Sequence, residues 1–317
     1  MKAARERLCQ FLFRPDSGRW IEVLRIGLAL QVILYAWSLR NDWRDLFGTT
    51  GPILVNRALA EAVLSGESLF TPRLGWLIAA GKLLGLAETT TLSLIWLLLL
   101  GAGLALFAGV CSRWAAITAW FLYLCSVKSG VLFSYGVDNF AVIGLFYLMI
   151  APLPKAWMPG HKLKSQPART LERLGFHRRV LQLHLCIIYF FGGVSKCLGS
   201  DWWNGVSVWR ALTRPPFDVV SPEVLIRFEG LLPLIGIGVC LLETGYPVLI
   251  WPRKSRAPWL IGILLMHISI ALTMGLYLFA FIMIVLNLAA FGPGAFSPFL
   301  RNTSRPCEKT SDNLLPG

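Results

Sequence analysis

Lys196 is the residue whose type and position best suit a chemical role. It ends the apolar run at residues 187–196 (IIYFFGGVSK), and residues 201–205 (DWWNG) follow almost at once. An ionisable group at the edge of a membrane-length run is costly, so it is by default a candidate functional residue. An apolar wall favours the neutral amine, which can act as a base, whereas a nearby carboxylate holds it charged. The alternative is a lysine that extends to the membrane surface within an aromatic belt.

Residues from three segments are expected to meet Lys196 at one face of the membrane. The turn before the fourth predicted helix contributes Asp138, and the segment after the lysine contributes Asp201. A carboxylate near the amine orients it or relays a proton, so both aspartates are candidate catalytic residues. The expected wall of a cofactor-binding site is formed by Tyr135, Phe191 and Trp202.

Glu243 and His267 fall within two predicted helices that form a hairpin. At 1.5 Å per residue, each lies roughly 12 Å from the basic end of its helix. We expect them to face each other, with Asn287 at a similar depth, and we count His267 as candidate catalytic and Glu243 as candidate cofactor-binding. Two interpretations stay open: a buried pair that fixes helix packing, and a proton relay. The same depths leave roughly 12 Å between Glu243 and Lys196, which argues against a transport path.

Composition identifies the class of protein that must hold these residues. The chain has 317 residues, of which 56% are hydrophobic and only 15% charged, and its mean hydropathy is +0.62. This is too apolar for a soluble domain of this size, so we expect an integral membrane protein. The net charge of +13 does not indicate nucleic acid binding, because the basic residues gather in short segments between apolar runs. Membrane orientation explains such segments better.

No motif of a soluble enzyme accompanies the lysine. The sequence has no phosphate-binding glycine-lysine loop, no Gly-x-Ser-x-Gly elbow and no His-Glu-x-x-His pair. The seven cysteines include no Cys-x-x-Cys pair, and the four histidines are dispersed. We therefore predict neither a disulfide framework nor a metal site.

We predict an all-α helical membrane bundle with about eight transmembrane helices, since crossing the hydrocarbon takes about 20 apolar residues. Residues 1–19 form a lead-in, 20–297 the transmembrane domain and 298–317 a short flexible tail. The run at 74–86 is too short to span and is assigned to an interfacial or re-entrant piece of the first loop. The predicted spans are 20–39, 89–110, 114–131, 134–153, 180–196, 231–251, 259–276 and 277–291.

Basic segments set the expected orientation. They are the lead-in, residues 111–113, 155–179 and 251–256, and the tail after 301, and the predicted spans place all of them on one side. By the positive-inside rule that side is the cytoplasm, so both termini are cytoplasmic and Lys196 opens to the opposite side. In a bacterium this membrane is the inner, or plasma, membrane.

The order of these motifs resembles the HTTM family, the horizontally transferred transmembrane domain related to vitamin K-dependent gamma-carboxylase. The resemblance covers roughly residues 13–297 and is most specific around the lysine. It is carried by residues 23–27 (VLRIG), 51–54 (GPIL), 135–138 (YGVD) and 188–196 (IYFFGGVSK), by Asp201, Trp202 and Gly205, and by His267 with the aromatic-rich helix that runs to Pro293.

The resemblance implies that Lys196 deprotonates a quinol such as vitamin K hydroquinone. In the carboxylase, oxygenation then gives an epoxide and a strong base that removes a glutamate proton before CO2 adds. It also implies a functional histidine at His267. Ser195 stands where the carboxylase has the first member of a lysine pair, and Asp138 where it has a polar histidine. We expect no large extramembrane substrate domain after the last helix, and this separates the chain from protein carboxylation.

Two classes of function follow. The first is a membrane enzyme, carboxylase-like or quinol-dependent, in which Lys196 acts as a base on a quinol or another lipid-soluble substrate. The second is a non-catalytic membrane partner or maturation factor of another protein. In both, the lipid bilayer is the surrounding partner and a protein partner or substrate is permitted.

Overall fold

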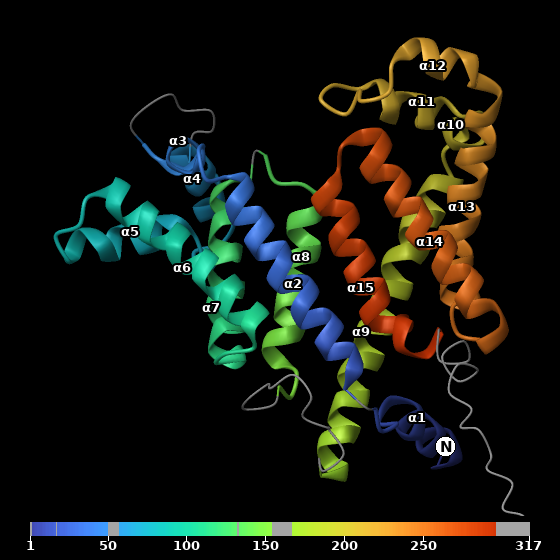
Figure 1. Ribbon diagram of the computed structural model, residues 1–317, viewed down its shortest axis with the longest axis horizontal. Helices are drawn as coiled ribbons and strands as arrows, with labels where there is room; N and C mark the ends of the chain where they lie inside the picture. The colour runs from blue at the N-terminus through green and yellow to red at the C-terminus, as the bar shows by residue number, and fades with distance from the viewer. Residues whose placement is uncertain (1, 17, 50–56, 132, 154–166, 296–317) are drawn as a thin grey trace, which may run out of the picture.

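The structure is a computed structural model that describes residues 2–16, 18–49, 57–131, 133–153 and 167–295. Every regular element in these ranges is a helix, as predicted, and the long helices form a bundle (Figure 1). The predicted motif at 51–54 and the predicted tail at 298–317 lie outside the described residues.

A helix occupies each of the predicted spans, with boundaries that differ by a few residues, except that the fifth begins well before its predicted span. Among the described residues, five helical segments are long and apolar enough to cross a membrane: α2, α6, α9, α14, and α13 together with the short 3-10 helix before it. This confirms an all-helical architecture suited to a bilayer, whereas the count of eight stays a prediction. The helices at the predicted spans are α2 (Arg19–Ser38), α6 (Glu88–Ala108), α7 (Ser112–Ser129), α8 (Gly136–Ile150), α9 (Ala168–Cys197), α13 (Leu232–Leu249), α14 (Arg253–Met274) and α15 (Tyr277–Ala295).

Helix α2 lies at the centre of the bundle, where it packs against α6, α8 and α15. Glycines make each of these contacts close. A Cβ on Gly27 of α2 would meet Val285 of α15 at 2.3 Å, and a Cβ on Gly144 of α8 would meet Leu28 at 2.8 Å. Small residues at helix interfaces let backbones approach in membranes, where burial against lipid gives little driving force.

Helices α9 and α13 form a second, antiparallel pair, and three glycines set its register. A Cβ on Gly193 of α9 would lie 2.6 Å from the backbone nitrogen of Thr244. Beyond the end of α9, Gly236 of α13 lies against the carbonyl of Trp202, and Gly205 against the backbone of Pro233. The chain after Lys196 therefore continues alongside the first half of α13.

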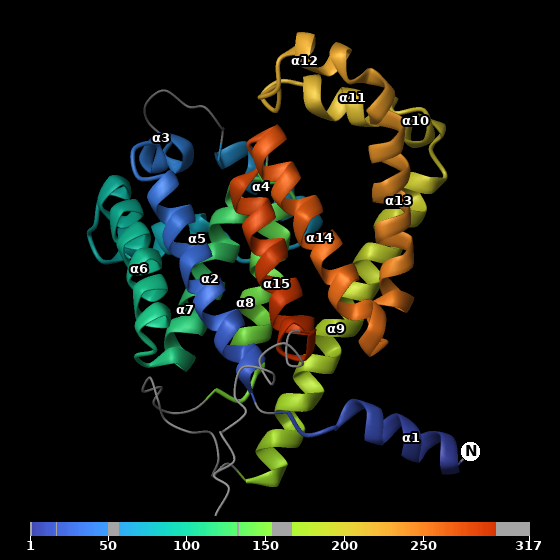
Figure 2. The ribbon, with the colours of Figure 1, turned by 45° about the vertical axis from the view of Figure 1, so that its right-hand side comes forward.

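Short helices cover the end of the α9–α13 pair that lies away from α1 (Figure 2). We call this part the cap; it consists of α10 (Ser200–Trp203), α11 (Val206–Thr213), α12 (Pro222–Arg227) and η2 (Glu229–Leu231). It has a small apolar core of its own, made of Val208, Leu212, Leu225 and Leu232. Helix α1 (Lys2–Leu12) lies at the opposite end of the bundle (Figures 1 and 2).

The first loop contains α3 (Trp43–Phe47), α4 (Arg57–Glu67) and α5 (Leu74–Leu83), held by a partly buried ionic network. Arg57 bonds the carboxylates of Glu61 and Glu88 at 3.2 and 2.9 Å. Glu61 also accepts hydrogen bonds from Ser129 at 2.6 Å and from the amide of Gly75 at 2.9 Å. The network ties α4 to α5, α6 and α7, and sequence patterns gave no sign of it.

Candidate functional site

Lys196 forms an ion pair with Glu243, and this pair is the centre of the candidate site. Lys196 Nζ lies 2.5 Å from Glu243 Oε2. The lysine side chain is 25% exposed and the glutamate side chain 10%, so both charged groups are largely buried within the protein. The ring of Trp202 lies 5.5 Å from the ammonium nitrogen, within the range of a cation–π contact.

The contact overturns the predicted gap of roughly 12 Å between these two residues. Glu243 lies in the interior of α13, about 16 Å along the helix from Leu232. Lys196, in the last turn of α9, therefore lies against the interior of α13 and not against the end of that helix. The estimate failed because it counted both depths from the ends of the predicted spans, whereas the chain after Lys196 runs beside α13 for about three turns. The separation that argued against a transport path does not exist.

Glycines beside the lysine make room for the pair. A Cβ on Gly192 would lie 3.2 Å from Glu243 Oε2 and 3.7 Å from Lys196 Nζ. The next residue, Gly193, brings the two helix backbones together one turn below the lysine. The glycine pair in the sequence thus has a local reason, because a larger side chain at either position would push the charged groups or the helices apart.

A chain of buried hydrogen bonds lies on the next turns of the same helices. Tyr246 donates to Asn287 Oδ1 at 2.7 Å, and Asn287 Nδ2 donates to Tyr189 OH at 2.8 Å. Tyr189 OH is 2.7 Å from His267 Nε2. The tautomer of the imidazole decides which of these two groups donates the proton in this contact. The other ring nitrogen of His267, Nδ1, is buried and has no hydrogen-bond partner within the described part of the chain.

The ion pair and the hydrogen-bonded chain form one polar cluster. Tyr189 lies seven residues before Lys196, which places both on the same face of α9. Glu243 lies close to Tyr189, and Lys196 lies close to His267. Glu243 and His267, which were expected to face each other, have different bonding partners: Glu243 bonds Lys196, and His267 bonds Tyr189. Asn287 does lie at their level, as predicted.

The two aspartates predicted to orient Lys196 have other partners. Asp138 caps the start of α8, where its Oδ2 accepts from the amide of Tyr135 at 3.0 Å and its Oδ1 from Tyr123 at 3.4 Å. Asp201 pairs with Arg210 at 2.6 Å on the exposed surface of the cap. The carboxylate that pairs with Lys196 is that of Glu243, and not that of Asp138 or Asp201 as predicted.

Of the predicted wall residues, the structure brings Trp202 to the lysine. Phe191 points outward from α9 with 65% of its surface exposed and contacts the ring of Phe190. Tyr135 lies at the start of α8 with 42% exposed. An exposed phenylalanine on a helix that is long and apolar enough to cross a membrane suits contact with lipid or with a lipid-soluble molecule.

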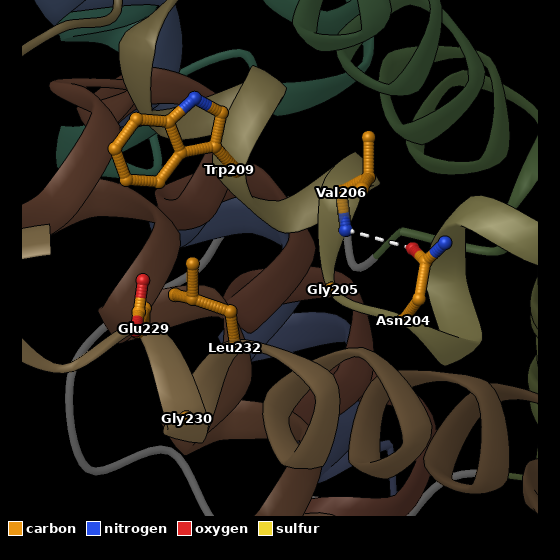
Figure 3. A pocket seen from close by; sticks show the side chains of 7 residues that line it. All are labelled: Asn204, Gly205, Val206, Trp209, Glu229, Gly230 and Leu232. Carbon is orange, nitrogen blue, oxygen red and sulfur yellow. Dashed lines mark hydrogen bonds between the residues drawn. The ribbon is translucent and has the colours of Figure 1, made fainter. Parts of the chain in front are cut away.

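A cavity of about 300 Å³ lies in the cap, away from the ion pair (Figure 3). The ring of Trp209 and the carboxylate of Glu229 lie on its walls, and the side chain of Asn204 accepts from the amide of Val206 at 3.0 Å. The cavity is open, and Lys196 is not among its lining residues. It is therefore not the candidate site.

Comparisons with known proteins do not identify a function for this chain. No family model matches the chain, no curated protein matches it, and no solved structure matches it. Within the described residues, no group of three or more side chains is arranged to hold a metal ion.

Proposed function

We propose that this chain is a membrane enzyme of the HTTM type in which Lys196 and Glu243 together move a proton from a lipid-soluble hydroxyl compound, with a quinol as the first candidate. The observation that carries the proposal is the largely buried contact of 2.5 Å between Lys196 Nζ and Glu243 Oε2. An ionisable pair inside the membrane is costly to maintain and marks functional sites. The resemblance to the carboxylase at residues 188–196 adds the substrate class.

The pair can act as a base through an internal proton shift. Glu243 takes one proton from the Lys196 ammonium, which leaves a neutral amine and a neutral carboxyl group. The amine lone pair then accepts the proton of the substrate hydroxyl, and the resulting ammonium stabilises the oxyanion beside it. One proton leaves the substrate and one is gained by the pair, so the charges balance. Low polarity around the pair favours the shift because it disfavours separated charges.

Residues around the pair would bind and supply the substrate. Trp202 offers an aromatic face 5.5 Å from the ammonium nitrogen, suited to stacking on a quinol ring. Exposed apolar side chains on the outer faces of α9 and α13, among them Phe191 and Leu241, fit a substrate that arrives from the bilayer. Tyr189 and His267 are hydrogen-bonded to each other on the next turns of the same bundle and would provide polar groups beside the pair.

We further propose an eight-span topology with both termini in the cytoplasm, in the inner membrane if the cell is bacterial. Support comes from the placement of helix α1 and the basic starts of α9 and α14 at one end of the bundle, opposite the cap. Positive charge is concentrated on cytoplasmic segments of membrane proteins. The Lys196 site would then open toward the non-cytoplasmic side.

The test is quinol binding and turnover by single variants in proteoliposomes. We expect Lys196→Gln and Glu243→Gln each to lower quinol turnover by about 100-fold or more, the usual scale for loss of a positioned base. Lys82→Gln and Glu223→Gln remove exposed charges of the same types and should leave turnover unchanged. Full turnover by a folded Lys196→Gln protein would overturn the proposal.

The second candidate, a non-catalytic membrane partner or maturation factor, is favoured by one surface. Val224, Ile226 and Phe228 on the cap are 46, 59 and 51% exposed, which fits contact with another apolar surface. Co-purification of a defined protein that is lost in Ile226→Ser and Phe228→Ser, and kept in Lys196→Gln, would support this role. Retention of the partner by both cap variants would count against it.

A further inference from the structure

Five arginines gather at the end of the bundle opposite the cap. They come from three places in the chain: the segment after α1, the first half of α9 and the first turn of α14. Their charges are close enough to repel one another. We call them the arginine cluster; its members are Arg14, Arg178, Arg179, Arg253 and Arg256.

Two of these guanidinium groups are held in place by aromatic rings and backbone carbonyls. Arg179 lies 4.4 Å from the ring centre of Phe11 and 5.2 Å from that of Trp251. It donates to the carbonyl of Phe11 at 3.1 Å and to Gln182 at 2.7 Å. Arg256 donates to the carbonyls of Ile250 and Trp251. Such contacts fix the planar groups without neutralising their charge.

The cluster has far more positive than negative charge. Arg178 pairs with Asp16 at 2.6 Å, and the other four arginines have no ion pair with a carboxylate in the described ranges. Arg253 and Arg256 lie in the first turn of α14, which is the positive end of that helix dipole. This turn contains no acidic residue that would offset their charge. The fold thus concentrates uncompensated positive charge at this point, which is unfavourable unless an anion is nearby.

Apolar side chains at the same end place the cluster at a membrane surface. Helix α1 runs across the end of the bundle and not along it (Figures 1 and 2). Leu8, Phe11 and Phe13 are 56, 38 and 44% exposed, beside the basic residues of the same segment. A basic helix with exposed aromatic and aliphatic side chains is typical of one that lies in the headgroup region.

We propose that the arginine cluster binds the phosphodiester headgroup of an anionic phospholipid in the leaflet at the α1 end. Guanidinium groups match phosphate oxygens in pairs, and aromatic rings at the headgroup level contact the first part of the acyl chains. A zwitterionic lipid would bring its own positive charge and gain less from the cluster. This site is independent of the chemistry at Lys196.

The test measures which lipids stay on the full-length protein. Protein from bilayers of equal phosphatidylglycerol and phosphatidylcholine is extracted, and the retained lipids are counted by native mass spectrometry. Each arginine near an anionic surface contributes about fivefold in binding. We expect wild type to retain phosphatidylglycerol preferentially, and Arg179→Gln with Arg256→Gln to lower that preference by at least about tenfold.

A second pair of substitutions keeps the test decisive if the first disturbs folding. Arg14 and Arg253 are exposed, so Arg14→Gln with Arg253→Gln should fold normally and still weaken phosphatidylglycerol retention. The matched control, Arg214→Gln with Arg227→Gln, removes two exposed arginines from the cap and should change nothing. Equal retention of both lipids by wild type would overturn the proposal. So would displacement of the lipid by millimolar glycerol 3-phosphate, since the occupant would then be a soluble phosphate ester.

Discussion

Lys196 and Glu243 depend on each other because neither charge has another partner of opposite sign in the described part of the chain. Removing one leaves the other largely buried and uncompensated, which costs about 3 kcal/mol, and less to the extent that water or headgroups reach it. Replacing both with apolar residues of similar size avoids that cost. The pair therefore contributes little net stability and constrains which substitutions the fold accepts.

This dependence gives a double-mutant prediction. We expect Lys196→Met and Glu243→Leu each to destabilise the protein by roughly 2 kcal/mol, and the double variant to recover most of that loss. The measurement is the free energy of unfolding of the four proteins in one detergent, compared as a thermodynamic cycle. Losses that simply add in the double variant would show that the two side chains do not interact.

Asn287 is the second residue on which many contacts depend. It accepts from Tyr246, donates to Tyr189 and donates to the carbonyl of Met283 at 2.9 Å. Asn287→Leu leaves the Tyr246 hydroxyl without its partner in an apolar interior and removes one of the two partners of Tyr189, so we expect a loss of about 2 kcal/mol in the free energy of unfolding. Asn41 is exposed, and Asn41→Leu should cost under about 0.5 kcal/mol. A loss at Asn287 no larger than at Asn41 would contradict the hydrogen-bonded chain.

At the scale of helices, the register of α9 and α13 decides the geometry of the candidate site. Gly193 lies against Thr244, and the helices run in opposite directions. One turn further toward the cap, this register places Cys197 of α9 opposite Cys240 of α13, where the two thiols are neighbours. Both cysteines are free in the structure.

The register predicts that Cys197 and Cys240 can be cross-linked. A disulfide requires a Cα separation of roughly 4.4–6.8 Å, and the close packing at Gly193, one turn away, favours a short separation between the two helices. We expect a mild oxidant to join these two cysteines in the purified protein, detected by mass spectrometry of non-reduced peptides. Cys9 and Cys111, both exposed, serve as controls and should not join either of them. A register shifted by one residue would leave Cys197 and Cys240 unlinked under the same conditions.

The apolar runs predicted the helices well because length and hydropathy are local properties of the sequence. The partner of Lys196 was missed because it lies 47 residues away and its depth was counted from span ends alone. Depth counting assumes that neighbouring helices begin at the same level, whereas α13 begins beside the cap. The network of Arg57, Glu61 and Glu88 was missed for a related reason, since charges in a loop show no periodicity that reveals their partners.

At the scale of the whole molecule, two ends of different character enclose the polar cluster. The end with the cap and the first loop has arginines that pair with acidic residues, as Arg57 does with Glu61 and Arg210 with Asp201. The α1 end holds the arginine cluster, in which only Arg178 is paired among the described residues. The charge distribution at both ends is consistent with one orientation, in which the α1 end faces the cytoplasm and contacts anionic lipid.

This asymmetry predicts which end an impermeant thiol reagent reaches. Cys9 on α1 is exposed, and Asp218→Cys would introduce an exposed thiol beside α12 in the cap. With the α1 end in the cytoplasm, a charged maleimide added to intact cells should label position 218 and leave Cys9 unlabelled until the membrane is permeabilised. Peptide mapping by mass spectrometry separates the two sites. Labelling of Cys9 in intact cells would reverse the orientation, and the Lys196 site would then open toward the cytoplasm.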